Sequence, residues 1–311
     1  MNYIQQAYKG KLEAWMVIIT TCVVSGIFVL NFIFYLFSSP EDLEASYDLM
    51  KSWDPNLTLI LNLGLFVPLI LLLFVFVKYV HQRSILSLTT SRPKVDFKRI
   101  FFTFFLVVVF TLVTFFISYY YDSSDIVYQF NPGRFAILFL ICVLLFPFQI
   151  GLEEYLFRGY LMQHIGVIVK NKWFPLILTS VLFGIMHSAN PEVAEIGYFK
   201  MMIFYVGTGL LLGIMTLMDE GLELALGFHL GNNLLAALLI TSDWSALQTD
   251  AIFKNTAEQG ISSITEILTP VIIVYPILLF ILSKKYGWTN WKDKLFGKVT
   301  PPPKEDYKVL D

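Results

Sequence analysis

Long apolar runs dominate the chain, and short polar stretches separate them. A helix that crosses a bilayer needs about 20 mostly apolar residues. Eight runs approach that length, and we expect helices over residues 15–37, 57–80, 100–120, 135 to about 169, 173–188, 201–218, 222–241 and 264–283. The pattern therefore predicts an all-α, polytopic transmembrane helix bundle of about eight spans.

The fourth run is longer than one span requires, so it must tilt, kink near Pro147 or leave the membrane as an interfacial helix. We divide the chain into three regions. Residues 1–134 hold spans one to three, residues 135–241 form a core, and residues 242–311 hold the last loop, the eighth span and a basic tail that we expect to be disordered. Loop 41–54 is acidic and is expected to carry a short amphipathic segment.

Composition agrees with a lipid bilayer as the surroundings. Hydrophobic residues make up 56% of the chain and charged residues 15%, whereas soluble domains are about one quarter charged. The net charge of -2 gives no reason to expect a nucleic-acid partner. Cys22 and Cys142 both lie in apolar runs and do not suggest a disulfide or a zinc site.

Lysine and arginine set the expected orientation. If the N-terminus is cytoplasmic and the spans alternate, the cytoplasmic segments hold 17 of the 22 basic residues and the outer loops hold four, with Arg158 in the membrane. This asymmetry favours both termini on the cytoplasmic side. From the short loops we expect a bacterial plasma membrane.

Three charges lie in or beside the fourth run, where each is costly. Glu154 and Arg158 are four residues apart on one helix face and can form an ion pair. Glu153 is turned away by about 100° and is left free to act as a general base. The structural alternative is a buried ion pair that only fixes helix packing, but it leaves Glu153 unexplained.

His187 ends the pattern Phe183-x-x-x-His187 in the fifth run. If the fourth and fifth runs form a hairpin that folds at about residue 171, Glu154 lies 17 residues before the fold and His187 16 after it. Equal rise then puts them at the same depth. The alternative is a histidine satisfied by a backbone carbonyl. Of the other two histidines, we expect His81 at the surface and His164 in an interfacial segment.

His229 and Asn233 share a face of the seventh run. The amide can orient the imidazole or donate to a developing oxyanion; the alternative is an amide that only joins two helices. Small residues let helices approach closely, and the pairs Gly227/Gly231 and Gly209/Gly213 suit this. Close approach would bring the polar face of the seventh span against spans four and five.

Together these side chains suit hydrolysis. A water held between Glu153 and a histidine can lose a proton and attack a carbonyl, while an imidazole or Asn233 steadies the oxyanion. The same set admits one zinc ion held by His187, His229 and Glu153, although the HExxH signature is absent. Neither a serine nor a cysteine has comparable spacing to a base, which disfavours a covalent nucleophile.

At these residues the sequence resembles the CPBP family of CaaX proteases and bacteriocin-processing enzymes, also called Abi. Its pattern, EExxxR then FxxxH then HxxxN or HxxxD, stands here as Glu153-Glu154…Arg158, Phe183…His187 and His229…Asn233. The resemblance covers residues 135–241 and implies an intramembrane endopeptidase. It implies that Glu153 activates water, that Glu154 and Arg158 support it, and that His187, His229 and Asn233 hold water or oxyanion.

The family admits both metalloprotease and metal-free glutamate mechanisms, and its substrates include prenylated proteins and peptide precursors. We therefore expect a peptide or membrane-protein substrate. A second hypothesis is a non-catalytic scaffold or a bacteriocin-immunity or regulatory factor on the same fold, although this chain keeps every motif residue. A third is a proton-relaying transporter, which ranks last because the polar groups lie in one contiguous region rather than in two inverted repeats.

Overall fold

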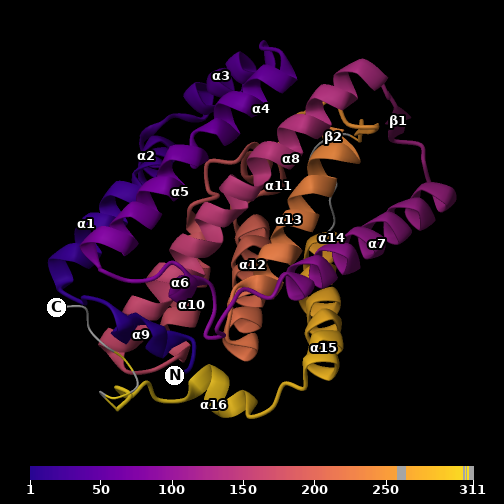
Figure 1. The fold of residues 1–311 in the computed structure, drawn as a ribbon. Helices are drawn as coiled ribbons and strands as arrows, with labels where there is room; N and C mark the ends of the chain where they lie inside the picture. Colours follow the sequence, from indigo (N-terminus) through magenta and orange to yellow (C-terminus); the bar gives the residue numbers. More distant parts are fainter. Residues whose placement is uncertain (258–263, 304, 306, 308–311) are drawn as a thin grey trace.

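The computed structural model describes residues 1–257, 264–303, 305 and 307, and nearly all of its regular structure is helical (Figure 1). The end of the tail that we expected to be disordered lies largely outside the described residues. The helical elements are η1 (Ile4–Lys9), α1 (Ala14–Val24), α2 (Gly26–Phe37), α3 (Pro40–Lys51), α4 (Pro55–Gly64), α5 (Phe66–Val75), η2 (Phe76–Val80), α6 (Leu86–Thr89), α7 (Phe97–Tyr121), α8 (Pro132–Glu154), η3 (Tyr155–Leu161), α9 (Met162–Val169), α10 (Trp173–Ile185), α11 (Pro191–Ile196), α12 (Tyr198–Asp219), α13 (Glu223–Leu238), α14 (Ile264–Thr269), η4 (Pro270–Val274), α15 (Tyr275–Tyr286) and α16 (Trp291–Phe296).

Each apolar run forms helix, which confirms a polytopic, all-α bundle. Within the described residues, five helical stretches are long and apolar enough to cross a membrane: Pro55–Val80, Phe97–Tyr121, Pro132–Val169, Tyr198–Asp219 and Ile267–Tyr286. The first run is a pair of helices, α1 and α2, bent by 63° at Ser25, and counts as a sixth span if taken as one. The fifth and seventh runs form the shorter helices α10 and α13, of 13 and 16 residues.

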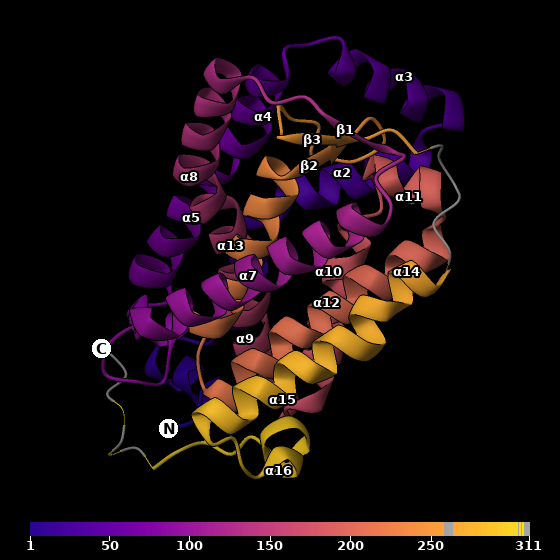
Figure 2. The same ribbon diagram turned by 90° about the vertical axis from the view of Figure 1, so that its right-hand side faces the viewer.

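The two ends of the bundle differ. The N-terminus, η1 and α16 lie at one end, which we call the terminal end (Figures 1 and 2). At the far end lie α3 and a three-stranded sheet in the order β1-β3-β2, formed by β1 (Ile126–Tyr128), β2 (Ile240–Ser242) and β3 (Phe253–Asn255). β1 runs antiparallel and β2 parallel to β3. α3 is the short helix expected in loop 41–54, and Ser39 and Asp42 form its capping box.

α13 lies at the centre, packed between α7 and α8. Gly227 makes the approach to α7 close, because a Cβ there would lie 2.1 Å from the carbonyl oxygen of Ile100. Gly209 does the same for α12 and α10, because its Cβ would lie 2.9 Å from the Ser180 carbonyl oxygen. The small residues therefore bring helices together as expected, but those of α13 face α7, and the opposite, polar face of α13 meets α8.

Candidate functional site

The two glutamates lie where the long fourth helix changes its winding. α8 ends at Glu154, the π-helical segment η3 follows, and α9 completes a continuous helical stretch over Pro132–Val169. Pro147 lies inside α8. π-helical turns are rare and frequently occur at functional sites. Glu153, Glu154 and Arg158 are 3%, 0% and 0% exposed, so all three charges are buried in the bundle.

Glu154 and Arg158 form the expected ion pair. A guanidinium nitrogen of Arg158 donates to Glu154 Oε1 over 2.9 Å, and another donates to the carbonyl of Gly209 over 3.2 Å. The guanidinium also lies 4.3 Å from the centre of the Phe183 ring, a cation–π contact. A buried charge is tolerated when it is paired and hydrogen-bonded. Glu154 is therefore held in place by a cation that itself contacts α10 and α12.

His229 of α13 lies between the two glutamates. Its Nδ1 is 2.9 Å from Glu154 Oε1, and its Nε2 is 3.7 Å from Glu153 Oε2. A carboxylate paired with Arg158 accepts, so Nδ1 carries the proton and Nε2 is the nitrogen that faces Glu153. The second distance is longer than a direct hydrogen bond, and a bridging group can span it. Glu153 Oε2 and His229 Nε2 therefore face each other and can bind the same small group.

Gln149 connects Asn233 to Glu153, a link that sequence reasoning missed. The amide nitrogen of Gln149 donates to Glu153 Oε1, and its amide oxygen accepts from Asn233 Nδ2 over 3.1 Å. Asn233 therefore bonds to Gln149 and reaches Glu153 through it. The available signal was a lone amide in an apolar run, four residues before Glu153 and so on the same helix face.

The predicted hairpin of the fourth and fifth runs is present. Its turn lies at residues 170–172, and a Cβ on Gly166 would contact the Pro175 ring at 3.5 Å. Phe183 packs against Phe157 with ring centres 5.8 Å apart, so the start of η3 and the end of α10 lie side by side. Phe157 lies three residues after Glu154, and Phe183 lies four residues before His187.

His187 does not join the glutamates directly. α10 ends at Ile185, so His187 lies in the turn that follows rather than within the helix. Its Nδ1 lies 2.7 Å from the Phe183 carbonyl oxygen, the backbone contact considered as the alternative. Phe183 separates the two site histidines, with ring centres 4.6 Å from His187 and 6.0 Å from His229. Described contacts include neither a hydrogen bond nor an ion pair from His187 to either glutamate.

The other two histidines form a separate buried cluster toward the terminal end. The expectation that His81 lies at the surface was wrong: it is 1% exposed, with Nδ1 2.9 Å from the Lys11 carbonyl and Nε2 2.8 Å from the Tyr160 hydroxyl. His164 is 2% exposed, and its ring centre lies 5.1 Å from that of His81. The chain folds its N-terminal segment and η3 around His81, which the local sequence could not show.

The residues suggested for zinc do not form a ligand set in this arrangement. Among the described residues, no group of three or more histidine, cysteine, aspartate or glutamate side chains is placed to hold a metal ion. His187 lies beyond Phe183, and His229 Nδ1 is used by Glu154. We therefore derive no chemical step through a metal.

Comparison with known proteins agrees with the family resemblance of the three motifs. Residues 133–235 match the family described as type II CAAX prenyl endopeptidase, Rce1-like, which confirms the resemblance inferred from the three motifs. Over 274 residues the chain is 28% identical to a Bacillus subtilis (strain 168) protein named "Uncharacterized protein YyaK", covering 85% of this chain and 87% of that protein. No solved structure matches.

Proposed function

We propose that this chain, a multi-pass membrane protein whose core matches the Rce1-like type II CAAX prenyl endopeptidase family, is an intramembrane endopeptidase that uses glutamate and histidine to activate water. One observation carries the proposal: His229 lies between Glu153 and the Glu154–Arg158 ion pair, all buried inside the helix bundle. An ion pair that only stabilised packing would not require a second glutamate facing the histidine.

The proposed step begins with a water that is hydrogen-bonded to both Glu153 Oε2 and His229 Nε2. A water about 2.8 Å from each atom fits beside a pair that is 3.7 Å apart. Glu153 takes a proton as the water oxygen attacks the carbonyl carbon of the scissile peptide. The tetrahedral oxyanion collapses, the C–N bond breaks, and the proton passes from Glu153 to the amine that leaves.

The remaining side chains orient this pair or stabilise charge. Glu154, fixed by Arg158, holds the His229 ring through Nδ1 so that Nε2 faces Glu153. Gln149 fixes the other oxygen of Glu153 and carries its link to Asn233. We assign to Asn233, whose amide nitrogen is a donor, the binding of water or oxyanion, because polar donors fixed before the reaction stabilise developing charge. We assign to His187 the binding of water, because its Nδ1 is used by the Phe183 carbonyl and its Nε2 is left as an acceptor.

The direct test compares purified, reconstituted wild type with Glu153→Gln and His187→Ala on a peptide library of prenylated and unprenylated sequences. Glu153→Gln removes the base, and we expect cleavage to fall at least about 100-fold. Glu44→Gln, an exposed glutamate on α3, is the matched control and should cleave as wild type does. Normal insertion of every variant shows that chemistry, not folding, was lost.

Two outcomes would contradict the mechanism. Cleavage that survives Glu153→Gln would exclude this base, and a non-catalytic scaffold would then be favoured if the variant also kept the cellular phenotype. A zinc chelator is expected to leave cleavage unchanged, because the described side chains do not form a metal ligand set. Cleavage lost with the chelator and restored by zinc would establish the metal mechanism instead.

We propose further that the protein lies in a bacterial plasma membrane, which its short loops suggest, and that both termini are cytoplasmic, which the lysine and arginine distribution favours. A Cys22→Ser, Cys142→Ser background allows single cysteines to report the side. Glu44→Cys on α3 should react with a membrane-impermeant reagent added outside intact cells, and Lys292→Cys on α16 only after lysis. The reverse pattern would invert the orientation.

A further inference from the structure

Tyr205 contacts the imidazole of His187 face to face. The tyrosine lies on α12, is 8% exposed, and its ring centre is 4.4 Å from that of His187 at an interplanar angle of 24°. Phe183 contacts the same imidazole at 4.6 Å. Because His187 lies in a turn after α10, its backbone alone does not fix the ring as a helix would. Two aromatic side chains supply that restraint.

The Phe183 carbonyl sets which nitrogen of His187 is free. A carbonyl oxygen only accepts, so Nδ1, 2.7 Å away, must donate. In the neutral imidazole the proton is then on Nδ1 and the lone pair on Nε2. Stacking uses the face of the ring and leaves its edge accessible. The His187 ring is therefore held by its face and by Nδ1, with Nε2 left to bind a polar group.

The phenol of Tyr205 is itself anchored. Its hydroxyl donates to Glu192 Oε1 over 2.5 Å and accepts from Asn190 Nδ2 over 3.0 Å. Glu192 Oε2 accepts from the backbone N–H of Ala246 over 2.9 Å. These bonds tie Tyr205 to α11 and to the loop that follows β2. A tyrosine ring has two side-chain torsions, so anchoring its hydroxyl end fixes the orientation of its face.

We propose that Tyr205 is a positioning residue that holds His187 with Nε2 available to the reacting group. The inference rests on the proposed function, because that function gives His187 the binding of water. Tyr205 belongs to none of the three sequence motifs, and its hydroxyl partners Glu192 and Asn190 also lie outside them. The site therefore extends from the motif helices to α11 and α12.

The kinetic test uses Tyr205→Leu, which removes both stack and hydroxyl, and Tyr205→Phe, which removes only the hydroxyl. Misplacing a group near the reacting atoms is costly, so Tyr205→Leu should lower kcat about 10- to 100-fold with little change in KM. Tyr205→Phe should lower kcat about fivefold, because the hydroxyl hydrogen bonds to Glu192 and Asn190 are lost while the ring remains. The matched control is Tyr198→Leu. Tyr198 lies on α12, as Tyr205 does, and stacks on Tyr35 of α2, so this variant also loses an aromatic stack but should keep wild-type kcat.

A readout that does not need cleavage separates this inference from the proposed function. In nitrogen-15 histidine-labelled protein, with His187 assigned by His187→Ala, the wild type should show one Nδ1-protonated tautomer. Tyr205→Leu should show exchange between tautomers, while Tyr205→Phe and Tyr198→Leu should not. An unchanged His187 spectrum in Tyr205→Leu would overturn the positioning role, whatever the cleavage result.

The two failures then look different. Wild type that cleaves nothing, with the His187 signal still altered in Tyr205→Leu, would remove the proposed function and keep the contact. Active wild type with unchanged kcat in Tyr205→Leu, or with equal losses in Tyr205→Leu and Tyr198→Leu, would overturn the inference alone. If Tyr205→Leu does not fold, Tyr205→Phe decides, and a wild-type kcat in that variant counts against the inference.

Discussion

Gln149 shows how a single side chain can connect motifs that are far apart in the sequence. Its amide nitrogen donates a hydrogen bond to Glu153, and its amide oxygen accepts one from Asn233. Each group uses the one role that its partner requires, since a carboxylate only accepts and the Asn233 amide nitrogen only donates. The orientation of the proposed base therefore depends on an amide from the same helix and on another from α13.

The two adjacent amides of α13 offer a matched comparison. Asn233→Leu removes the donor to Gln149, so Gln149 is freer to turn and Glu153 loses its fixed orientation. We expect kcat to fall about tenfold, the equivalent of about 1.4 kcal/mol. Asn232→Leu changes an exposed side chain with no bond to Gln149 among the described contacts and should stay within about twofold of wild type. Equal effects in steady-state cleavage would contradict the bridge.

His81 makes stability depend on pH. Burial lowers the pKa of His81 below its usual value of about 6.5, and the nearby Arg83 charge lowers it further. The hydrogen bond to the Lys11 carbonyl raises this pKa but does not cancel the lowering. Below pH about 6.5 the unfolded chain therefore binds a proton that the folded chain resists. The stabilisation is complete above that pH and is lost as the pH falls toward the folded pKa. Protonation would also remove the acceptor that Nε2 offers to the Tyr160 hydroxyl.

We therefore expect the midpoint temperature of thermal unfolding in detergent to decrease when the pH is lowered from 7 to 5. The variant His81→Gln carries no titrating group at this position and should show a smaller fall over the same range. A midpoint with the same pH slope in the two proteins would show that other groups, and not His81, govern acid sensitivity.

At the scale of helices, glycine positions decide which elements meet. A Cβ on Gly227 would lie 2.1 Å from the Ile100 carbonyl oxygen and 2.6 Å from Thr103 Oγ1, so α7 and α13 can approach only because none is present. A Cβ on Gly64, at the end of α4, would meet nothing within 4 Å. The two glycines thus differ in packing although both lie in apolar helices.

Gly227→Ala should destabilise the protein by about 1–3 kcal/mol, because overpacking forces the helices apart. Gly64→Ala should be neutral or stabilising by up to about 1 kcal/mol, because alanine favours helix. Denaturant unfolding of both variants in the same detergent gives the comparison. A Gly227→Ala protein as stable as Gly64→Ala would show that α7 can move away from α13 without loss of stability.

The sequence predicted what local periodicity controls and missed what depends on contacts between helices. The apolar runs became helices, and the spacing of Glu154 and Arg158 gave their ion pair. The prediction of one helix over residues 15–37 missed the bend at Ser25, although a serine followed by a glycine is a pair at which helices kink, and it missed the π-helical turns of η3. Spacing also could not show that Asn233 would contact Gln149, or that Phe183 would lie between the two histidines.

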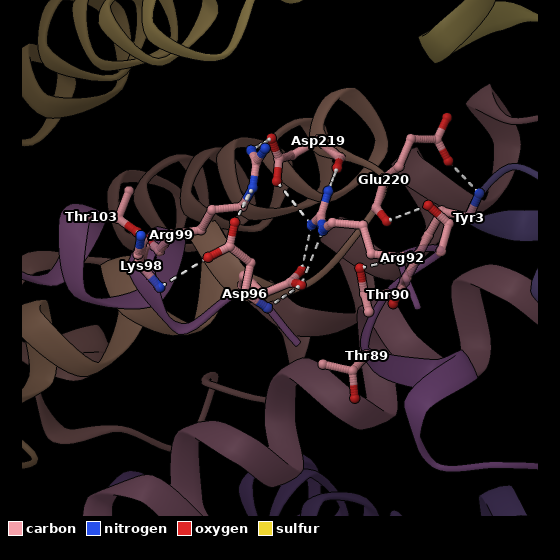
Figure 3. Close-up of polar contacts among 12 residues, drawn as sticks. Tyr3, Thr89, Thr90, Arg92, Asp96, Lys98, Arg99, Thr103, Asp219 and Glu220 are labelled. Carbon is pink, nitrogen blue, oxygen red and sulfur yellow. Dashed lines mark hydrogen bonds and ion pairs between the residues drawn. The ribbon is translucent and has the colours of Figure 1, made fainter. Parts of the chain in front are cut away.

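Over the whole molecule, an ion network at the terminal end ties distant segments together (Figure 3). Its centre is the acidic corner between α12 and α13. Arg92 pairs with Asp219 at 3.1 Å and with Glu223 at 2.7 Å, and Arg99 reaches Asp219 at 2.5 Å. Glu220 in the same corner accepts from the Tyr3 backbone N–H and pairs with a lysine of α16, so both terminal segments join the network.

Arg92→Met would leave Glu223, whose side chain is 0% exposed, without its charge partner. Removing one member of a buried pair costs about 3–5 kcal/mol, so we expect the thermal midpoint to fall by several degrees. Lys51→Met breaks the exposed pair with Asp48 and should cost less than about 1 kcal/mol. Similar midpoints for the two variants would show that Glu223 finds another partner or takes up a proton.

The shortness of α10 has a consequence for the surrounding lipid. A 13-residue helix is about 20 Å long, whereas the hydrocarbon core of a bilayer is about 30 Å thick. Trp173 and Ile177 are exposed on this helix, so we expect lipid tails to contact it. We therefore expect a hydrophobic mismatch that thins the bilayer beside α10, and bilayers with short acyl chains should suit the protein best.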